Sequence, residues 1–362
     1  MMKKIAYIFS ILSLLSFSCN DDFLDTAPYD SLSSSNAWIS DGNAVMAVNG
    51  IYAALNLGQG LDDLGDAFAN YTRLGPDGTY YTAGSIETGT SSARDGLYLN
   101  YYTMYYRVIL YANIAISNLS GPNNITPALR DRLIGEAKFL RGYAYFYLWQ
   151  LYGGVIIMDR PLLPSETYLP RNTAEEVRDF VISNFTDAIP KLPVSYTSID
   201  IGRATQGAAI AMLGKTYLYD KQWGNAVTEF SKLMTSPFSY SLHPEYYQLF
   251  DWKWENNSEV IFDLQQVMEP GLGSDYDMLY ATRAGAGSGW DVEHVSYTTY
   301  SNYTLPDGSP IDMSTMPKRS DYPTEYDYGL DLIPWYQTTF ANADKRLHGN
   351  AIMPGFRFIG YN

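Results

Sequence analysis

Cysteine and histidine are the scarcest chemistry-bearing residues of this 362-residue chain. It contains one cysteine, Cys19, and three histidines. A single cysteine excludes an intrachain disulfide and a cysteine-based zinc cluster. His243, His294 and His348 lie far apart in the sequence and lack metal-ligand spacing, so we expect satisfied or exposed side chains there. The sequence therefore predicts no metal site and no cofactor.

Positive charge is also in short supply. The chain has 24 Lys and Arg against 39 Asp and Glu, a net charge of −15. This balance argues against nucleic acid or an anionic lipid surface as the main ligand. Tyrosine is abundant instead, with 33 residues. Its ring is apolar and its hydroxyl polar, which suits helix interfaces and also the binding of polar, ring-shaped ligands.

Catalytic motifs are missing as well. The chain has no nucleophile elbow and no lysine-bearing phosphate loop. Glycoside hydrolysis needs two carboxylates, and neighbouring pairs occur at residues 62–63, 175–176 and 275/277. An acidic chain supplies such pairs by chance, and Glu175–Glu176 is explained below by helix capping. We therefore predict no catalytic residue, with a surface glycosidase as an alternative hypothesis.

Residues 1–18 form a targeting segment. Lys3 and Lys4 precede a short apolar run that ends at Phe17, which is too short for a comfortable membrane span. Cys19 follows directly, in an arrangement that resembles a bacterial lipoprotein signal. This resemblance implies that Cys19 is the lipid-attachment residue. Residues 19–40 would then be a lipidated tether that anchors the mature chain to a membrane.

Helical periodicity dominates residues 41–237. The longest helix is predicted around residues 130–154, where apolar residues recur every three or four positions at Leu133, Ala137, Leu140, Ala144, Tyr147 and Leu151. Thr126 is expected to cap this helix and Gly153–Gly154 to end it. Its opposite face is expected to carry charged residues: Arg130, Arg132, Lys138 and Arg141.

Further helices are predicted over residues 41–57, 97–119 and 173–189, and from Thr205 onward. Thr173 and Glu176 form a capping box at the start of the third of these. The pair beginning at Thr205 follows the tetratricopeptide pattern at Leu213, Gly214, Tyr217, Ala226, Phe230 and Pro237. The predicted fold class is mainly α, a tetratricopeptide-like helical solenoid in which each helix buries its apolar face on the next.

Two irregular regions accompany the helices. Residues 58–96 read as an inserted loop, and residues 238–362 as a loop-rich subdomain with a short strand at Val260–Leu264. Sugars present apolar C–H faces and hydroxyl rims, which aromatic rings and charged or amide groups match. The candidate ligand-binding residues in and beside these regions are Asp77, Tyr80, Tyr81, Arg94, Asp95, Tyr98, Tyr276, Trp290, Tyr297 and Tyr300.

Several strings of residues resemble the SusD/RagB family, the surface nutrient-binding lipoproteins of Bacteroidetes. They are CNDDFLDTAP at 19–28, EAKFLRGYAYFYLWQLYGGV at 136–155, NSEVIFDLQ at 257–265 and LPDGSPI at 305–311. The resemblance implies a core of four tetratricopeptide-like units and a ligand face in residues 58–98 and 270–300. It also implies a partner, a SusC-like TonB-dependent transporter that the helical units usually face.

Two departures from the family pattern stand out. Residues 342–347 match its Arg-Asp-Pro-Arg segment only roughly, and family members usually continue beyond the position of Asn362. We therefore expect a chain truncated at its C-terminus. The resulting hypothesis is a non-catalytic, surface-exposed lipoprotein of the outer membrane that binds oligosaccharides for a transporter. A repeat scaffold that binds only protein is a third hypothesis, and peptide remains open as cargo.

Overall fold

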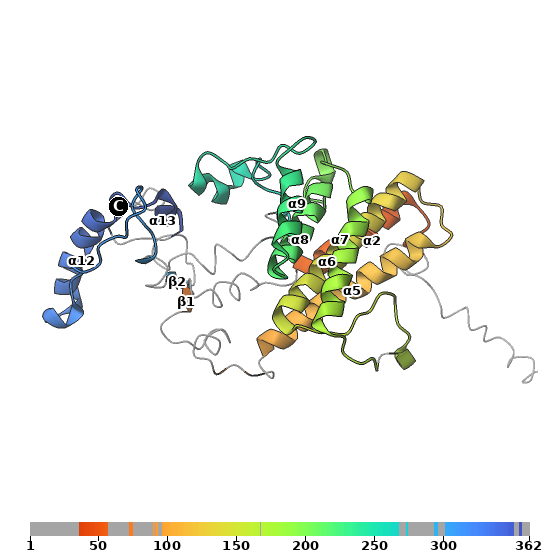
Figure 1. Ribbon diagram of the computed structural model, residues 1–362, viewed down its shortest axis with the longest axis horizontal. Helices are drawn as coiled ribbons and strands as arrows, with labels where there is room; N and C mark the ends of the chain where they lie inside the picture. The colour runs from red at the N-terminus through yellow and green to blue at the C-terminus, as the bar shows by residue number, and fades with distance from the viewer. Residues whose placement is uncertain are drawn as a thin grey trace, which may run out of the picture.

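Figure 1 shows the computed structural model, which is mainly α-helical, as the periodicity predicts. The structure describes residues 36–56, 72–74, 90, 92, 96–166, 168–267, 273, 293–295, 301–350 and 355–356. Its helices are α2 (Asp41–Asn56), α5 (Gly96–Ser120), α6 (Pro127–Tyr152), α7 (Ala174–Ala188), α8 (Gln206–Tyr219), α9 (Trp223–Leu233), α12 (Glu325–Thr339) and α13 (Lys345–Asn350). The strands β1 (Thr72–Leu74) and β2 (Glu293–Val295) form a two-stranded sheet.

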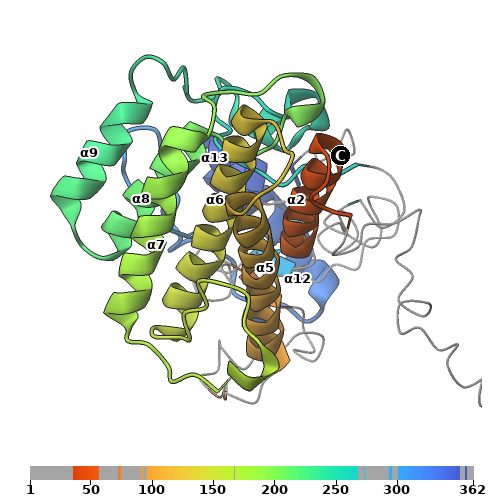
Figure 2. The same cartoon turned by 90° about the vertical axis from the view of Figure 1, so that its right-hand side faces the viewer.

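The first six of these helices stand side by side in one row. Figure 2 shows the order α2, α5, α6, α7, α8, α9, and each helix contacts the next one along the chain. Consecutive packing of this kind is the defining feature of a helical solenoid, because each repeat contacts only its neighbours. The predicted helical-repeat core, called the helical stack below, is confirmed.

Helix α6 lies in the middle of the helical stack and is buried on almost every face. The predicted stripe is buried at Leu133, Ala137, Leu140 and Ala144. The prediction of an exposed charged face is wrong for Arg141, because α5 and α7 cover opposite sides of α6. The guanidinium of Arg141 donates to Asn184 Oδ1 at 2.8 Å and to Asn113 Oδ1 at 2.7 Å, which compensates its burial.

Local sequence signals explain most of the helix ends. The capping box is present: Thr173 Oγ1 accepts from Glu176 N at 3.2 Å, and Glu176 Oε2 accepts from Thr173 N at 2.8 Å. Gly153 ends α6 with a φ of 69°, a conformation that favours glycine. Thr126 occupies the N-cap position of α6, as predicted, but its side chain makes no capping bond, and its hydroxyl donates to Asp41 Oδ2 at 2.6 Å instead. That bond joins the start of α6 to the start of α2.

The tetratricopeptide pattern is explained by the packing of α8 against α9. A Cβ atom on Gly214 would lie 2.7 Å from the Phe230 ring, so this position needs glycine. Leu213 on α8 and Ala226 on α9 are both buried. Thr205 caps α8 by accepting from Ala208 N at 3.1 Å. The repeat residues therefore specify how closely the two helices approach.

The C-terminal region contains helices where the sequence predicts loops. Helices α12 and α13 contribute to a small second core built from Ile311, Tyr336, Phe340, Ala343 and Leu347. Thr324 caps α12 by accepting from Asp327 N at 3.1 Å, a start signal that periodicity alone does not show. The described part of residues 238–362 is therefore loop-rich, as predicted, but it also contains α12 and α13, which the sequence pattern did not predict.

The predicted strand at Val260–Leu264 is also wrong. In the described part of the chain this segment forms no strand. Its apolar side chains cover the helical stack instead: the Phe262 ring lies 4.9 Å from Phe139 and 6.1 Å from Tyr143, measured between ring centroids. A run of Val, Ile and Phe fits a strand and a covering segment equally well.

Candidate functional site

The structure joins the two regions in which ligand contacts are expected. Strand β1 lies within residues 58–98 and β2 within residues 270–300, and the two strands pair antiparallel. Thr72 is opposite Val295, Arg73 opposite His294 and Leu74 opposite Glu293. Segments distant in the sequence therefore meet at one place. We call residues 58–98 and 270–300 the ligand loops.

Of the ten candidate ligand-binding residues, the structure describes Tyr98. The other nine lie outside the described residues: Asp77, Tyr80, Tyr81, Arg94, Asp95, Tyr276, Trp290, Tyr297 and Tyr300. Cys19 and the segment 1–35 also lie outside them. These assignments stay predictions.

Tyr98 lies in the first turn of α5, where the helix emerges from a ligand loop. Its carbonyl accepts from the Tyr152 hydroxyl at 2.5 Å. Tyr152 in turn packs edge-to-face on Tyr102, with centroids 5.4 Å apart, and Tyr102 lies 4.5 Å from Tyr106. Aromatic pairs in this range stabilise each other. This tyrosine cluster (Tyr98, Tyr102, Tyr106 and Tyr152) fixes the backbone from which the loop departs.

The hydroxyls of Tyr106 and Tyr152 stay protonated at neutral pH. Burial raises the pKa of Tyr152 to about 12 and the pKa of Tyr106 further still. The Tyr106 hydroxyl donates a hydrogen bond to the Ile156 carbonyl at 2.6 Å. Tyr106 therefore acts as a neutral donor that holds α5 against the segment after α6, and Tyr152 as a neutral donor that holds the end of α6 against the start of α5. They have no acidity that would serve catalysis at neutral pH.

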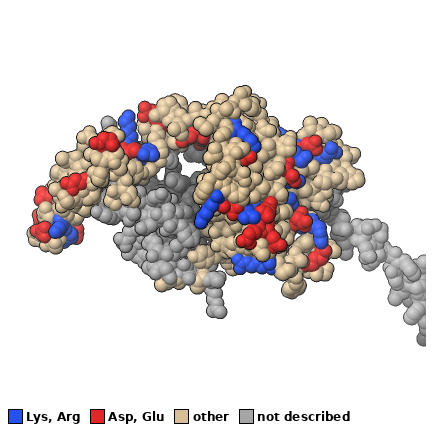
Figure 3. Space-filling view, in the orientation of Figure 1, with Lys and Arg blue, Asp and Glu red and all other residues tan. Residues whose placement is uncertain are grey.

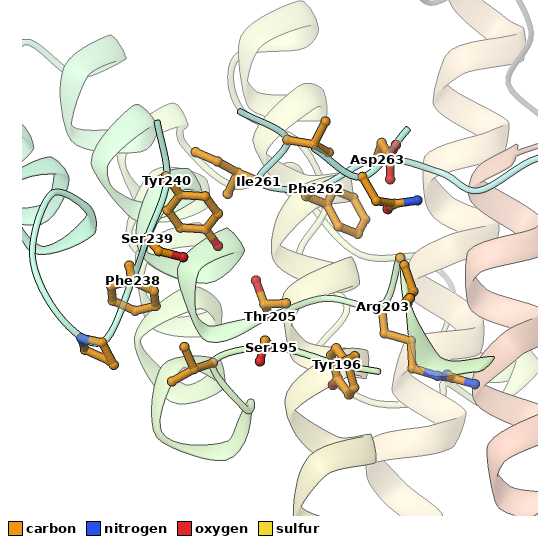
Figure 4. A pocket seen from close by; sticks show the side chains of 16 residues that line it. Ser195, Tyr196, Arg203, Thr205, Phe238, Ser239, Tyr240, Ile261, Phe262 and Asp263 are labelled. Carbon is orange, nitrogen blue, oxygen red and sulfur yellow. The ribbon is translucent and has the colours of Figure 1, made fainter. Parts of the chain in front are cut away.

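A pocket that the sequence did not predict opens beside the helical stack, and Figure 4 shows it from close by. Its volume is about 270 Å³. Three segments build it: residues 194–205 between α7 and α8, residues 237–240 after α9, and residues 256–263. The sequence shows aromatic residues in these segments, but no residue spacing indicates that the segments meet in space.

A buried ion-pair network lies next to this pocket. Glu136 on α6 is fully buried, and its Oε2 accepts from Arg203 Nη1 at 3.1 Å and from the Tyr52 hydroxyl at 2.9 Å. Asp200 accepts from Arg203 Nε at 2.5 Å and from Arg132 Nη1 at 3.0 Å. Two carboxylates are thereby matched by two guanidinium groups, which is what burial of charge requires.

The pKa shifts in this network are those expected of paired charges that stabilise the fold. Desolvation raises the pKa of Glu136, and the charges of Arg203 and Arg132 oppose that rise. Desolvation acts in the same sense on Asp200, but hydrogen bonds from Arg203 and Arg132 outweigh it and lower the pKa of Asp200. The network joins α2, α6 and the segment before α8 through charges that are already paired.

Charge on the visible face of the molecule is mixed. Figure 3 shows Lys and Arg interspersed with Asp and Glu over the helical stack, with wide uncharged areas between them. Among the residues that the structure describes, no three His, Cys, Asp or Glu side chains gather as a metal site would require. None of the helices in this described part is long and apolar enough to cross a membrane.

Comparison with known proteins identifies the family. The family described as "Starch-binding associating with outer membrane" (SusD-like) matches residues 22–218. A SusD-like protein of Bacteroides ovatus is 26% identical over 333 residues, which cover 84% of this chain and 58% of that protein. The chain therefore spans a little over half the length of this relative.

Solved structures show the same fold. A SusD-like protein from Bacteroides fragilis superposes with a TM-score of 0.72 at 22% identity, over 90% of this chain and 62% of that one. Surface glycan-binding protein A from Bacteroides thetaiotaomicron, solved in complex with laminarihexaose, gives a TM-score of 0.64 at 20% identity, over 73% of this chain and 61% of that one. The match to the family covers more than half of the chain, residues 22–218, and the chain belongs to the SusD-like family.

Proposed function

We propose that this protein captures an oligosaccharide at the outer surface of the outer membrane and passes it, chemically unchanged, to a TonB-dependent transporter. The observation that carries the proposal is the pairing of β1 with β2, because it brings the two ligand loops together. The family description names starch binding and the outer membrane. A structural relative binds laminarihexaose, which supports a glycan as the cargo.

The composition of the ligand loops suits a neutral sugar chain. They carry the aromatic candidates Tyr80, Tyr81, Tyr98, Tyr276, Trp290, Tyr297 and Tyr300 beside Asp77, Arg94 and Asp95. Aromatic rings pack against the C–H faces of sugars, and carboxylate and guanidinium groups bind hydroxyls. Tyr98 would stand where the loop joins the helical stack, held there by the tyrosine cluster.

Affinity electrophoresis tests the glycan-binding part of this proposal. The protein without residues 1–18 would be run through native gels that contain starch, laminarin or other glycans of a panel. We expect at least one glycan to retard it, and a Trp290→Ala variant to be retarded less. If no glycan of the panel slowed migration, the proposal would fail.

The same panel separates binding from hydrolysis. A binding protein leaves the length of a labelled glycan unchanged during long incubation, whereas a glycosidase shortens it. Release of labelled products that disappears in an Asp62→Asn, Asp63→Asn variant would favour the glycosidase alternative.

The anchoring and the partner need a separate experiment. Lipidation of Cys19 would hold the protein at the membrane, so a Cys19→Ala variant is expected in the soluble fraction of the producing cells. Solubilised wild-type protein is expected to co-purify with a TonB-dependent transporter. A protein-binding scaffold would also co-purify with a membrane protein, but it would show no affinity for any glycan.

A further inference from the structure

The pocket beside the helical stack is separate in sequence from both ligand loops. It is lined by residues of 194–205, 237–240 and 256–263, all of which the structure describes. The proposed function does not use it. Its walls and its chemistry nevertheless resemble those of a small-ligand site, which are mostly apolar with a few convergent polar groups.

The walls of the pocket are held in place by close packing. Phe262 is fixed against Phe139 at a centroid distance of 4.9 Å. A Cβ atom on Gly207 would lie 2.2 Å from the Tyr240 hydroxyl oxygen, so Tyr240 occupies the space that glycine leaves on α8. Gly202, with a φ of 90°, leaves room in the same way for Gln265. Such packing forms the pocket in advance of any ligand, which lowers the entropic cost of binding.

The apolar part of the lining combines aromatic and aliphatic side chains. Its aromatic members are Tyr196, Phe238, Tyr240 and Phe262, and its aliphatic members are Val194, Ile201, Pro237, Val260 and Ile261. The rings of Phe238 and Tyr240 are nearly parallel, with an interplanar angle of 14° and centroids 6.0 Å apart. Tyr196 contributes its ring, because its hydroxyl is buried. These side chains offer flat apolar surfaces against which the C–H face of a sugar can pack.

The polar part of the lining consists mainly of neutral groups. Ser195, Thr205 and Ser239 bring hydroxyls and Asn256 an amide, and Figure 4 shows the Tyr240 side chain extending between these segments. Arg203 also lines the pocket, but its guanidinium is bound to Asp200 and Glu136. Its charge is therefore already compensated, and an anionic ligand such as a phosphate would find no free cation there.

One carboxylate remains to accept hydrogen bonds from a ligand. Asp263 lines the pocket and accepts from Gln265 Nε2 through Oδ1 at 2.5 Å. An ionised carboxylate has capacity for further donors, which sugar hydroxyls supply. A negatively charged ligand would be repelled by the same group. The lining therefore selects a neutral ligand with several hydroxyl groups.

The size of the pocket restricts the ligand further. Its 270 Å³ falls just below the range of about 300–1,000 Å³ that is typical of drug-sized ligands. A single six-membered sugar ring is the size class that suits it. From these observations we propose that the pocket binds one neutral pyranose ring, either as a free monosaccharide or as the terminal residue of a glycan. The inference that the ligand is a sugar rests on the proposed function. The existence and the lining of the pocket do not depend on it.

Saturation-transfer NMR with glucose, galactose and mannose tests the proposal, with glucuronate as the charged comparison. We expect at least one neutral sugar to receive saturation and to bind with millimolar affinity in a calorimetric titration, and glucuronate to bind more weakly. Ser195→Trp fills the pocket from one wall and Ser239→Trp from another. Each is expected to weaken binding by about tenfold or more.

Thr197→Trp is the matched control, because Thr197 is exposed, lies two residues from Ser195 and does not line the pocket. It is expected to leave the affinity unchanged. Thermal unfolding of each variant shows whether it is folded. The proposal is overturned if none of the three neutral sugars binds to the wild-type protein. It is also overturned if the folded pocket variants bind as well as Thr197→Trp does.

Two further comparisons separate this site from the ligand loops. Long glycans are expected to retard the pocket variants as much as the wild-type protein, but to retard Trp290→Ala less. Trp290→Ala is expected to bind the monosaccharide as well as the wild-type protein does. Monosaccharide binding without any retardation by a glycan would support the pocket and contradict the proposed function. If a glycan competes with the monosaccharide, and the same glycan with its reducing end reduced to an open-chain alditol does not, the ligand is the reducing-end residue of that glycan.

Discussion

The helical stack and the C-terminal helices bury their apolar residues to very different extents. Helix α6 is buried on nearly all sides, and even Glu136 and Arg141 are enclosed there with their partners. Helix α12 buries Tyr336 and leaves Tyr326 74% and Leu330 54% exposed. Each helix of the stack has neighbours along the row, whereas the second core consists of a few side chains on α12, α13 and the segments beside them.

The difference indicates which part of the fold contributes most of its stability and which part tolerates substitutions. A helix packed on both sides loses many contacts when one side chain is removed, because close-packed interiors do not collapse freely. A small peripheral core opens locally at a lower cost than global unfolding. We therefore expect the helical stack to be a rigid support. Four substitutions test this difference between the two regions.

The largest effect is expected from Phe139→Ala in α6. Phe139 is fully buried and contacts the rings of Phe185 and Phe262 at 5.8 and 4.9 Å. Removing a buried Phe ring costs about 3–5 kcal/mol in the free energy of unfolding, as chemical denaturation would measure. Leu110→Ala is the control, since Leu110 on α5 is exposed, and it should change little. Equal effects of the two would contradict the central position of α6.

A comparable loss in the free energy of unfolding is expected from Arg203→Met, and a second substitution should restore part of it. The variant leaves Glu136 buried with Arg132 as its remaining cation at 3.4 Å. Breaking a buried ion pair by removing one partner costs about 3–5 kcal/mol. In the double variant with Glu136→Leu, Arg132 and Asp200 still pair at 3.0 Å, so part of the loss should be regained. A double variant as unstable as the sum of both single variants would show that the two charges do not interact.

A local effect is expected from Phe340→Ala in the second core. Phe340 is fully buried against Tyr336 and Trp335, with centroids 5.6 and 5.9 Å away. Hydrogen exchange should become faster in α12 and α13 while α6 keeps its protection, because the two cores open separately. Faster exchange throughout α6 would instead show that both regions unfold as one unit.

The smallest effect concerns an exposed ion pair in the loop after α6. Arg160 and the backbone N–H of Leu163 donate to Glu166, which lowers its pKa from 4.5 to about 2. A pKa that is lower in the folded state contributes stability above the unfolded value, and this contribution is lost as the pH falls toward 2. NMR titration of Glu166 should show this midpoint, and Arg160→Met should raise it toward 4.5. An unchanged midpoint would show that Arg160 is not the cause.

The sequence predicts the helical stack well because its signals are local and repeated. The box of Thr173 and Glu176 and the glycine at 153 each act within one turn of helix. The predictions from sequence are wrong where contacts between distant segments determine the surroundings of a residue. Arg141 reads as a surface residue until α7 covers it, and Val260–Leu264 reads as a strand until Phe262 packs on α6.

The candidate site stays a prediction, made for two regions of the chain and not for a fixed constellation of residues. Two aromatic-rich stretches suggested a ligand face, and the register of β1 with β2 joins them. No local pattern could show that Thr72 pairs with Val295, because the two strands lie far apart in the sequence. The pocket between residues 194–205 and 256–263 was missed for the same reason.

We propose above that the ligand loops bind a glycan while the helical stack supports them. The most direct measurement is calorimetric titration of the wild-type protein and a Trp290→Ala, Tyr98→Ala variant with oligosaccharides of the glycan that retards migration most. We expect saturable binding by the wild type and a loss of about tenfold or more in the variant, while its thermal unfolding stays close to that of the wild type. Equal affinities of the two proteins, with both folded, would contradict the account.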